Sequence, residues 1–250
     1  MKALLAAAVP VLWLGAAGTA AAATQDPHLE RYAARTIVTG TDLRSRPAGM
    51  AACLADVLVK VSGDPTIAGD RRLPALLAQA GSYATDFEYR DRMSGISHHD
   101  EQGSSDRPYD LTVRFDPARI DAALRALGRA PWPDPRPLLA LHVHVSDAQG
   151  AFDLTETAPR GAGMRAAIRD SAEKYGMPAV VPGDAPPADA VPLPGTLTLS
   201  EAALGWVVSW HLERQGRGYA WGVAGVNFDE AFRDGIRGAM QVLSGHGAPQ

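Results

Sequence analysis

The stretch APWPDPRP, residues 130–137, has a proline at every second position. Proline fixes its own φ angle and lacks an amide hydrogen, so this spacing favours an extended connector that belongs to neither a helix nor a sheet. Helix and strand patterns lie on both sides of it. We therefore expect two folded parts, divided as follows: an N-terminal domain at 24–130, the connector at 131–137, a C-terminal domain at 138–245 and a tail at 246–250.

The N-terminal part alternates between strand and helix patterns. A short strand is predicted at residues 35–39, and the segment PAGMAACLADVLVKVSG at residues 47–63 predicts a helix. After a second short helix at residues 72–80, two alternating strands follow, and Asp116 with Pro117 predicts the start of another helix. The side chains expected on the apolar face of the long helix are Cys53, Leu54, Val57, Leu58 and Val61. Those expected on one face of each strand are Tyr83, Thr85, Phe87 and Tyr89, and Tyr109, Leu111, Val113 and Phe115.

The C-terminal part has the same kinds of pattern. A strand at residues 138–145 and a helix at residues 164–175 precede a short strand at residues 179–181. We interpret residues 183–195 as a loop, because this segment is polar and rich in proline. A hairpin and a final helix that begins at Asn227 complete the pattern. The residues expected to point inward from that helix are Phe228, Phe232, Ile236, Met240 and Leu243.

The order strand, helix, strand, strand, helix is therefore predicted twice. Sequence identity between the two parts is too low to identify a repeat, so only the order is shared. This order is typical of a small sheet that helices cover on one face. The predicted fold class is α+β, with two small sandwich-like units.

Residues 1–23, MKALLAAAVPVLWLGAAGTAAAA, have the three-part pattern of a secretory signal peptide. Lys2 supplies the positive charge, an apolar run follows, and the small residues Ala21 and Ala23 precede Thr24. The run is too short and too rich in alanine for a bilayer-spanning helix. No cysteine lies near the cleavage region for lipid attachment. We expect cleavage near Ala23, a periplasmic location and no transmembrane segment in the mature chain.

The charge and cysteine content exclude several classes of protein. Removal of Lys2 leaves 23 of the 24 basic residues against 28 acidic ones, a formal charge of −5, so no attraction to nucleic acid is expected. Beyond residue 23 lysine occurs only at Lys60 and Lys174, and the other basic residues are arginines. Cys53 is the single cysteine, so an intramolecular disulfide is impossible and the fold depends on apolar burial.

Three segments resemble one bacterial family of exported proteins. They are DVLVKVSGDP at Asp56–Pro65, DEQGSSDRPYDLTVRFDPARIDAALRALG at Asp100–Gly128 and PWPDPRPLL at Pro131–Leu139. Together they are similar to the family catalogued as domain of unknown function 2066, over residues 30–245. The resemblance implies a soluble envelope protein, and it implies no activity, cofactor or catalytic residue.

Two groups of histidines are candidate metal ligands. His98, His99 and Asp100 lie together in the loop between the paired strands, and imidazole and carboxylate groups are ligands that zinc prefers. Adjacent residues rarely converge on one ion, so a solvated loop is the alternative. His142 and His144 are two apart on a predicted strand and therefore face the same way. They either bind a metal with a third ligand or line a sheet face beneath a helix.

Four aromatic residues of the predicted hairpin form a candidate partner-binding surface. On adjacent strands their side chains make a continuous patch, and exposed patches of tryptophan and tyrosine mark interaction sites. The alternative is a core face beneath the final helix, which needs an apolar partner. The four residues are Trp206, Trp210, Tyr219 and Trp221.

Catalytic patterns are weak in this sequence. Gly161, Gly163 and Ala166 match a dinucleotide-binding spacing, but about 15 residues separate them from the preceding strand. No nucleophile elbow, HExxH motif or Walker loop occurs, and Cys53 lies on an apolar helix face. We therefore expect no cofactor and a non-enzymatic exported module that binds another envelope protein. The alternatives are a metal- or small-ligand-binding protein that uses the histidines and, third, a hydrolase whose site has no sequence signature.

Overall fold

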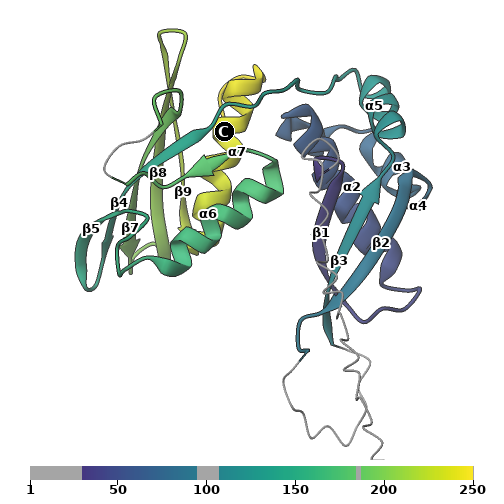
Figure 1. Ribbon diagram of the computed structural model, residues 1–250, viewed down its shortest axis with the longest axis horizontal. Helices are drawn as coiled ribbons and strands as arrows, with labels where there is room; N and C mark the ends of the chain where they lie inside the picture. Colours follow the sequence, from purple (N-terminus) through teal and green to yellow (C-terminus); the bar gives the residue numbers. More distant parts are fainter. Residues whose placement is uncertain (1–29, 95–106, 184–186, 250) are drawn as a thin grey trace, which may run out of the picture.

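Two sheets, each covered by helices on one face, form the described part of the chain (Figure 1). The computed structural model describes residues 30–94, 107–183 and 187–249. The expected signal peptide at residues 1–23 lies outside these ranges. Both helices and strands are abundant, which confirms the predicted α+β class. None of the helices in the described ranges is long and apolar enough to span a bilayer.

The N-terminal unit, residues 30–128, contains a three-stranded antiparallel sheet. Its central strand is β3, which pairs with β1 on one side and β2 on the other. The elements in chain order are β1 (Ala33–Thr39), α2 (Arg46–Ser62), the 3-10 helix η1 (Pro65–Gly69), α3 (Leu73–Leu77), α4 (Ala80–Tyr83), β2 (Ala84–Asp91), β3 (Pro108–Phe115) and α5 (Pro117–Ala126).

The core of the N-terminal unit lies between its helices and one face of its sheet. Cys53, Leu54 and Val57 of α2 are fully buried, because the apolar residues of this helix recur at helical spacing. Leu111 of β3 packs into the same cluster from the sheet. Gly63 ends α2 in the left-handed conformation, with φ 72°, and donates its amide to the Val59 carbonyl. The helix predicted from this stretch is therefore confirmed within one residue at each end.

The C-terminal unit, residues 139–249, contains a larger mixed sheet in the order β5-β4-β7-β8-β9, with the short β6 also paired to β4. β4 runs parallel to β7 and β6, and the other neighbours are antiparallel. The sequence did not predict β5, which pairs with β4 across a tight turn. The elements are β4 (Leu139–Asp147), β5 (Gly150–Leu154), α6 (Ala162–Tyr175), β6 (Ala179–Val180), β7 (Val191–Ser200), β8 (Gly205–Arg214), β9 (Arg217–Val226) and α7 (Phe228–Ser244).

The prediction of a loop at residues 183–195 is wrong for its last part, because Val191 begins β7, an interior strand of the sheet. Val191 donates its amide to the carbonyl just before β4, at 2.7 Å, so the odd-numbered residues of this part of β7 bond to β4. Pro192 and Pro194 therefore turn their nitrogens towards the β8 side. The β8 ladder begins only at Gly195, so neither proline interrupts it.

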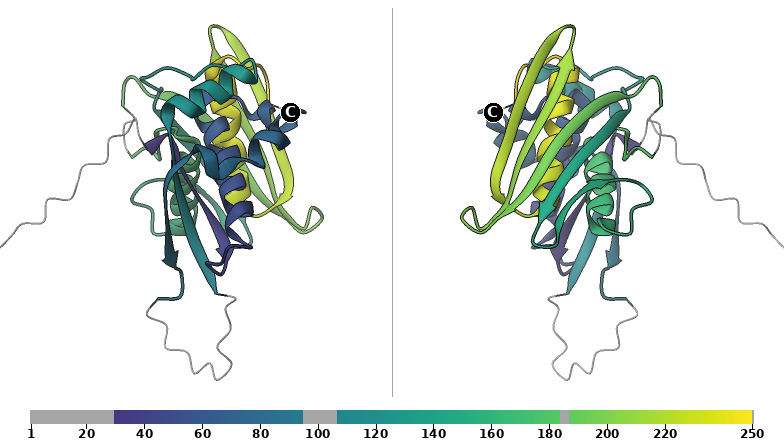
Figure 2. Two further views of the ribbon diagram at one scale, coloured as in Figure 1. Left: turned by 90° about the vertical axis from the view of Figure 1, so that its right-hand side faces the viewer. Right: turned by 90° about the vertical axis from the view of Figure 1, so that its left-hand side faces the viewer.

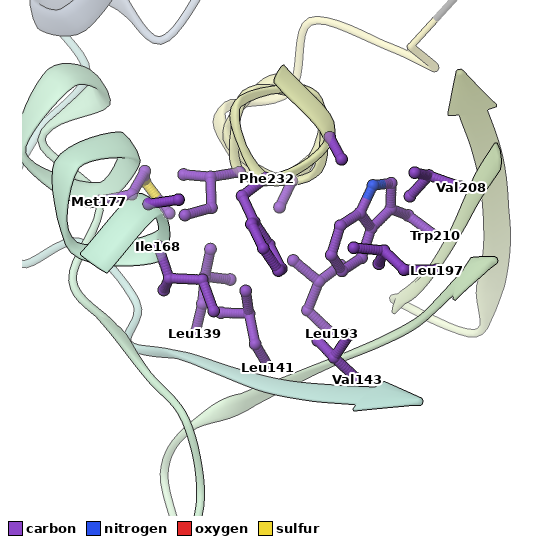
Figure 3. Packing of buried hydrophobic residues seen from close by; sticks show 14 of the residues in the cluster. Leu139, Leu141, Val143, Ile168, Met177, Leu193, Leu197, Val208, Trp210 and Phe232 are labelled. Carbon is purple, nitrogen blue, oxygen red and sulfur yellow. The ribbon is translucent and has the colours of Figure 1, made fainter. Parts of the chain in front are cut away.

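The core of the C-terminal unit forms where α6 and α7 cover the sheet (Figure 3). Side chains from β4, β7 and β8 converge there on Phe232 of α7, which is fully buried. The ring of Trp210, 1% exposed, lies between Gly195 of β7 and Gly235 of α7. A Cβ atom at either glycine would approach the ring to 2.3 or 2.5 Å. The two glycines therefore provide the space that the indole fills.

Candidate functional site

The histidines predicted as metal ligands form no metal-binding cluster in the part of the chain that the structure describes. His142 and His144 are exposed on β4, because their side chains alternate with buried ones and point away from the helices. The alternative, that they line a sheet face beneath a helix, is therefore wrong. His144 Nδ1 is 2.7 Å from Asp153 Oδ1 on β5. Outside the described ranges lie His98, His99 and Asp100.

The four hairpin aromatics do not form an exposed patch. Trp210 and Trp221 are buried beneath α7, and the Trp221 indole donates to the Asp234 carbonyl of that helix at 3.3 Å. Trp206 and Tyr219 are half-buried against the same core. Their inward face on the sheet is the one that α7 covers, so the core interpretation of this group holds and the partner-binding interpretation is wrong.

A groove of about 1290 Å³ lies between the two units, and we call it the inter-unit groove. One wall is the face of the N-terminal sheet that its own helices leave uncovered, together with an edge of α2. The other wall is α6 with the start of α7. Figure 1 shows α6 on the side of the C-terminal unit that faces β1, and Figure 2 shows the two units from either side.

The sheet wall carries alternating charges on β2 and β3. Arg114 of β3 lies 3.4 Å from Asp86 and 3.2 Å from Glu88 on β2. Asp110 of β3 accepts a hydrogen bond of 3.0 Å from Arg92. Ile37 of β1 interrupts this polar wall, and it is an exposed large hydrophobic residue, 58% exposed. The wall therefore offers charges of both signs around one apolar side chain.

Two ion pairs connect the walls of the groove. Arg35 of β1 reaches Glu173 of α6, with 3.5 Å between nitrogen and oxygen. Lys174 of α6 donates a hydrogen bond to Asp56 of α2. Both pairs join residues that lie more than one hundred positions apart, so they form only once the units are in contact. They set the separation of β1 and α2 from α6.

Arg136 of the connector lies next to the groove and is almost fully buried. Its guanidinium donates to the carbonyls of Tyr175 and Gly176 at the end of α6, at 2.9 and 3.1 Å. It also donates to the carbonyls of Lys60 and Val61 in the last turn of α2. The last carbonyls of a helix lack partners within the helix, so one cation here satisfies the ends of two helices. Burial lowers the pKa of Arg136 to about 10.

Lys60 of α2 points from the buried side of the helix to the start of β1. It is 5% exposed, and its Nζ donates to the Ala33 carbonyl at 2.7 Å. Burial lowers its pKa to about 8, against an opposing attraction from Glu173, Asp56 and Glu30. A lysine in this position presents a single partly desolvated ammonium group beside the groove.

The edge of β1 away from β3 pairs with no strand in the described residues. Two hydrogen bonds at the ends of β1 show which of its backbone groups bond to β3. The Gly40 amide donates to the Arg107 carbonyl, and the Phe115 amide donates to the Tyr32 carbonyl. The amides and carbonyls of the even-numbered residues of β1 therefore point towards β3. The amides and carbonyls of Arg35 and Ile37 therefore point away from β3, and both residues line the groove. Ala33 has the same orientation, and its carbonyl is the one that Lys60 occupies.

Serine, histidine and aspartate side chains meet at another contact between the units. Ser244 Oγ lies 2.8 Å from His246 Nδ1, and His246 Nε2 lies 3.9 Å from the buried Asp64 Oδ2. The Ser244 hydroxyl is also 2.8 Å from the Gly63 carbonyl, which accepts its hydrogen. Burial opposes ionisation of Asp64, but hydrogen bonds from Thr66 together with its other partners outweigh it and hold the pKa of Asp64 below its ordinary value. This cluster joins the end of α7 to the end of α2.

The groove residues were not among the candidates that the sequence suggested. One signal for them was present, because Lys60 and Lys174 are the only lysines after residue 23 and both line the groove. Lys60 also follows Val57 by three positions and therefore belongs to the buried face of α2, where lysine is rare. A lysine on an apolar helix face indicates a specific polar partner.

Comparison with known proteins corrects the family resemblance. No curated protein and no solved structure matches the chain. The similarity to domain of unknown function 2066 is wrong, since the family that matches is a different one. Residues 27–133, which include the whole N-terminal unit, match a domain of unknown function (DUF8605).

Proposed function

We propose that this chain is an exported, non-enzymatic binding module that holds an extended segment of a partner envelope protein in the inter-unit groove. The observation that carries the proposal is the free edge of β1 on the groove wall. The backbone groups of Arg35 and Ile37 lie on this edge with no described strand to bond them, and both residues line the groove. A segment that lies along this edge gains main-chain hydrogen bonds whatever its sequence, which is the way many domains bind extended peptides.

The side chains beside the edge supply specificity. Ile37 offers an apolar contact, and its exposure gives a bound segment apolar area to bury. Arg90 on the sheet wall and Asp170 on the helix wall form no ion pair with a described residue. They are free to pair with an acidic and a basic side chain of the segment. The preferred ligand is therefore an extended peptide with an apolar residue flanked by charges of both signs.

Lys60 limits the register of the bound segment. Its ammonium already occupies the Ala33 carbonyl, so pairing starts beyond that residue. The chain also carries a signal-peptide pattern at residues 1–23, which supports an envelope partner. The acidic balance of the remaining chain supports a protein rather than a nucleic-acid partner.

Selection from a library of random displayed peptides tests the proposal. We expect the chain to select extended peptides, and Ile37→Pro to weaken their binding at least tenfold, measured by titration calorimetry. Proline at this position removes an amide on the free edge of β1 and leaves the β3 ladder intact. Ile37→Ala is the matched control, because it shortens the side chain and keeps the amide.

The two variants separate backbone pairing from side-chain contact. A selected peptide that binds Ile37→Pro as tightly as the parent chain would place the site elsewhere, and recovery of no peptide from the library would contradict the proposed function. Circular dichroism of each variant shows whether the secondary structure of the chain is retained.

A further inference from the structure

A second unpaired edge lies on the C-terminal unit, at the outer strand β9. β9 has ten residues and pairs only with β8 among the described strands. The hairpin turn consists of Gln215 and Gly216, with φ 51° and 73°, so Arg214 and Arg217 close it. Hydrogen-bonded pairs then alternate along the ladder. The amides and carbonyls of Gly218, Ala220 and Gly222 consequently point away from β8.

This edge has few of the features that keep strand edges from pairing: its one irregularity, a register shift that leaves Gly225 unpaired, lies beyond the segment from Gly218 to Val223. From Gly218 to Val226, β9 has no charged residue and no proline. β2, an edge strand of the other sheet, carries Asp86, Glu88 and Arg90. Charged side chains, proline and short length are the usual protection of an exposed edge. Between Gly218 and Val223 the edge is without them and is an open template for another strand.

The side chains of β9 divide by size between the two faces of the sheet. On the outer face Gly218, Ala220, Gly222 and Ala224 are all small and exposed. On the inner face Trp221 is buried, while Tyr219 and Val223, two positions to either side of it, are only half-buried. The pattern is therefore symmetrical about Trp221, with a large apolar residue on each flank.

We propose that β9 pairs antiparallel with β9 of a second copy of this chain, about a two-fold axis at Trp221. In this register Tyr219 lies opposite the partner's Val223 and Val223 lies opposite the partner's Tyr219. An aromatic residue opposite a β-branched one is a favourable cross-strand pair. Ala220 lies opposite the partner's Gly222, so the outer face presents no steric obstacle.

A second copy fits this edge better than an unrelated strand because two identical copies of the edge match each other when they run antiparallel. A two-fold contact requires that one patch match itself, and the symmetry of the pattern about Trp221 meets this condition. The absence of charge between Gly218 and Val226 avoids repulsion between identical strands. The dimer has one continuous sheet and leaves the inter-unit groove of each copy unoccupied, so this inference is independent of the proposed function.

Sedimentation velocity on the purified chain tests the proposal. We expect a dimer for the parent chain and a monomer for Ala220→Pro, which removes an outward amide and keeps the β8 ladder. Ala220→Thr keeps the amide and is expected to remain dimeric. A parent chain that is monomeric at all concentrations would overturn the proposal, and so would an Ala220→Pro variant that dimerises as the parent does.

The register has a separate test that uses complementary charges. Tyr219→Asp and Val223→Lys each place an unpaired charge in the contact, and each variant alone is expected to be monomeric. In an equimolar mixture the aspartate of one copy faces the lysine of the other, while the remaining tyrosine and valine still meet. We expect the mixture to form a heterodimer. Two folded variants that stay monomeric when mixed would overturn this register.

Discussion

At the scale of single residues, the Arg136 side chain makes hydrogen bonds to the ends of two helices. It lies in the connector and donates to carbonyls at the ends of α2 and α6. The ring of Trp132 lies 4.7 Å from its guanidinium carbon and covers one face of the group. Lysine offers a point charge without the planar fork, so only arginine reaches both helix ends at once.

We predict that Arg136→Met lowers the free energy of unfolding by roughly 2–4 kcal/mol, because buried carbonyls of two helices lose a charged donor. Unfolding by urea, followed by circular dichroism, measures the loss. We also expect the transition to broaden or split, since the two units lose a shared contact. Arg44→Met is the control: Arg44 is exposed, and among the described residues its ion pair is with Asp42 nearby, so its loss changes stability little. Equal midpoints for Arg136→Met and the parent chain would contradict the bridging role.

At the scale of elements, α7 approaches the sheet through glycines that face tryptophan rings. Gly235 faces Trp210, and a Cβ atom at Gly238 would lie 2.4 Å from the Trp221 ring. Glycine is a poor helix former, so its use at two positions of one helix needs a reason in packing. The close contact of helix and indole rings supplies it.

We predict that Gly235→Ala lowers the free energy of unfolding by roughly 1–3 kcal/mol, although alanine favours the helix by about 1 kcal/mol. The new methyl group is 2.5 Å from the Trp210 ring, and the surrounding core has no room for it to move. Gly163→Ala in α6 is the matched control, because its Cβ atom meets only ordinary contacts of 3.5 Å with Phe228. We expect the control to be neutral or more stable. Thermal unfolding of both variants decides between the two outcomes.

Helices and strands were predictable where apolar residues recur at a single spacing, either helical or alternating. The apolar spacing of α2, α5 and α7 and the alternation of β2, β3 and β8 identify these elements correctly. β7 was missed because Pro192 and Pro194 normally exclude an interior strand. They are tolerated here because their nitrogens point to the β8 side, where the pairing with β7 begins only at Gly195. This can be seen only from the register of β4, β7 and β8.

The groove was less predictable than the elements that form it. Its contacts, such as Arg35 with Glu173, join residues of two different units. Charged residues on strand faces and helix faces are normally solvated, so the sequence pattern of β2 and β3 does not distinguish a groove wall from an open surface. Among the groove residues, only Lys60 has an unusual position in the sequence pattern, because it lies on an apolar helix face.

At the scale of the whole molecule, two contacts at the C-terminal end of α2 hold the units together. Trp132 donates its amide to the Val61 carbonyl at 2.8 Å, and Ser244 at the end of α7 reaches the Gly63 carbonyl. A Cβ atom at Gly63 would come within 3 Å of both Ser244 and Trp132, so the three segments pack closely. The separation of the units at the groove also depends on Arg136 and on the ion pairs that Arg35 and Lys174 make with Glu173 and Asp56.

Lys60, near the end of α2, makes the stability of the folded chain depend on pH. Its pKa is about 8 in the folded chain and 10.5 for a free lysine. Below pH 8 it is protonated in both states, and its burial is unfavourable. Between these two values the folded state has released the proton while the unfolded state still holds it. Stability therefore rises with pH across this window, because the unfolded state binds more protons.

We predict that the difference in unfolding free energy between the parent chain and Lys60→Met shifts in favour of the parent by roughly 2–3 kcal/mol from pH 7 to pH 10. Urea unfolding at a series of pH values measures this difference. Burial raises the pKa of Cys53 and of Tyr175 to about 12, which lowers stability at alkaline pH, but both residues are present in both proteins and contribute little to the difference. A difference that stays constant over this range would mean that Lys60 keeps its proton in the folded chain, and that its contact with Ala33 retains a full positive charge beside the free edge of β1.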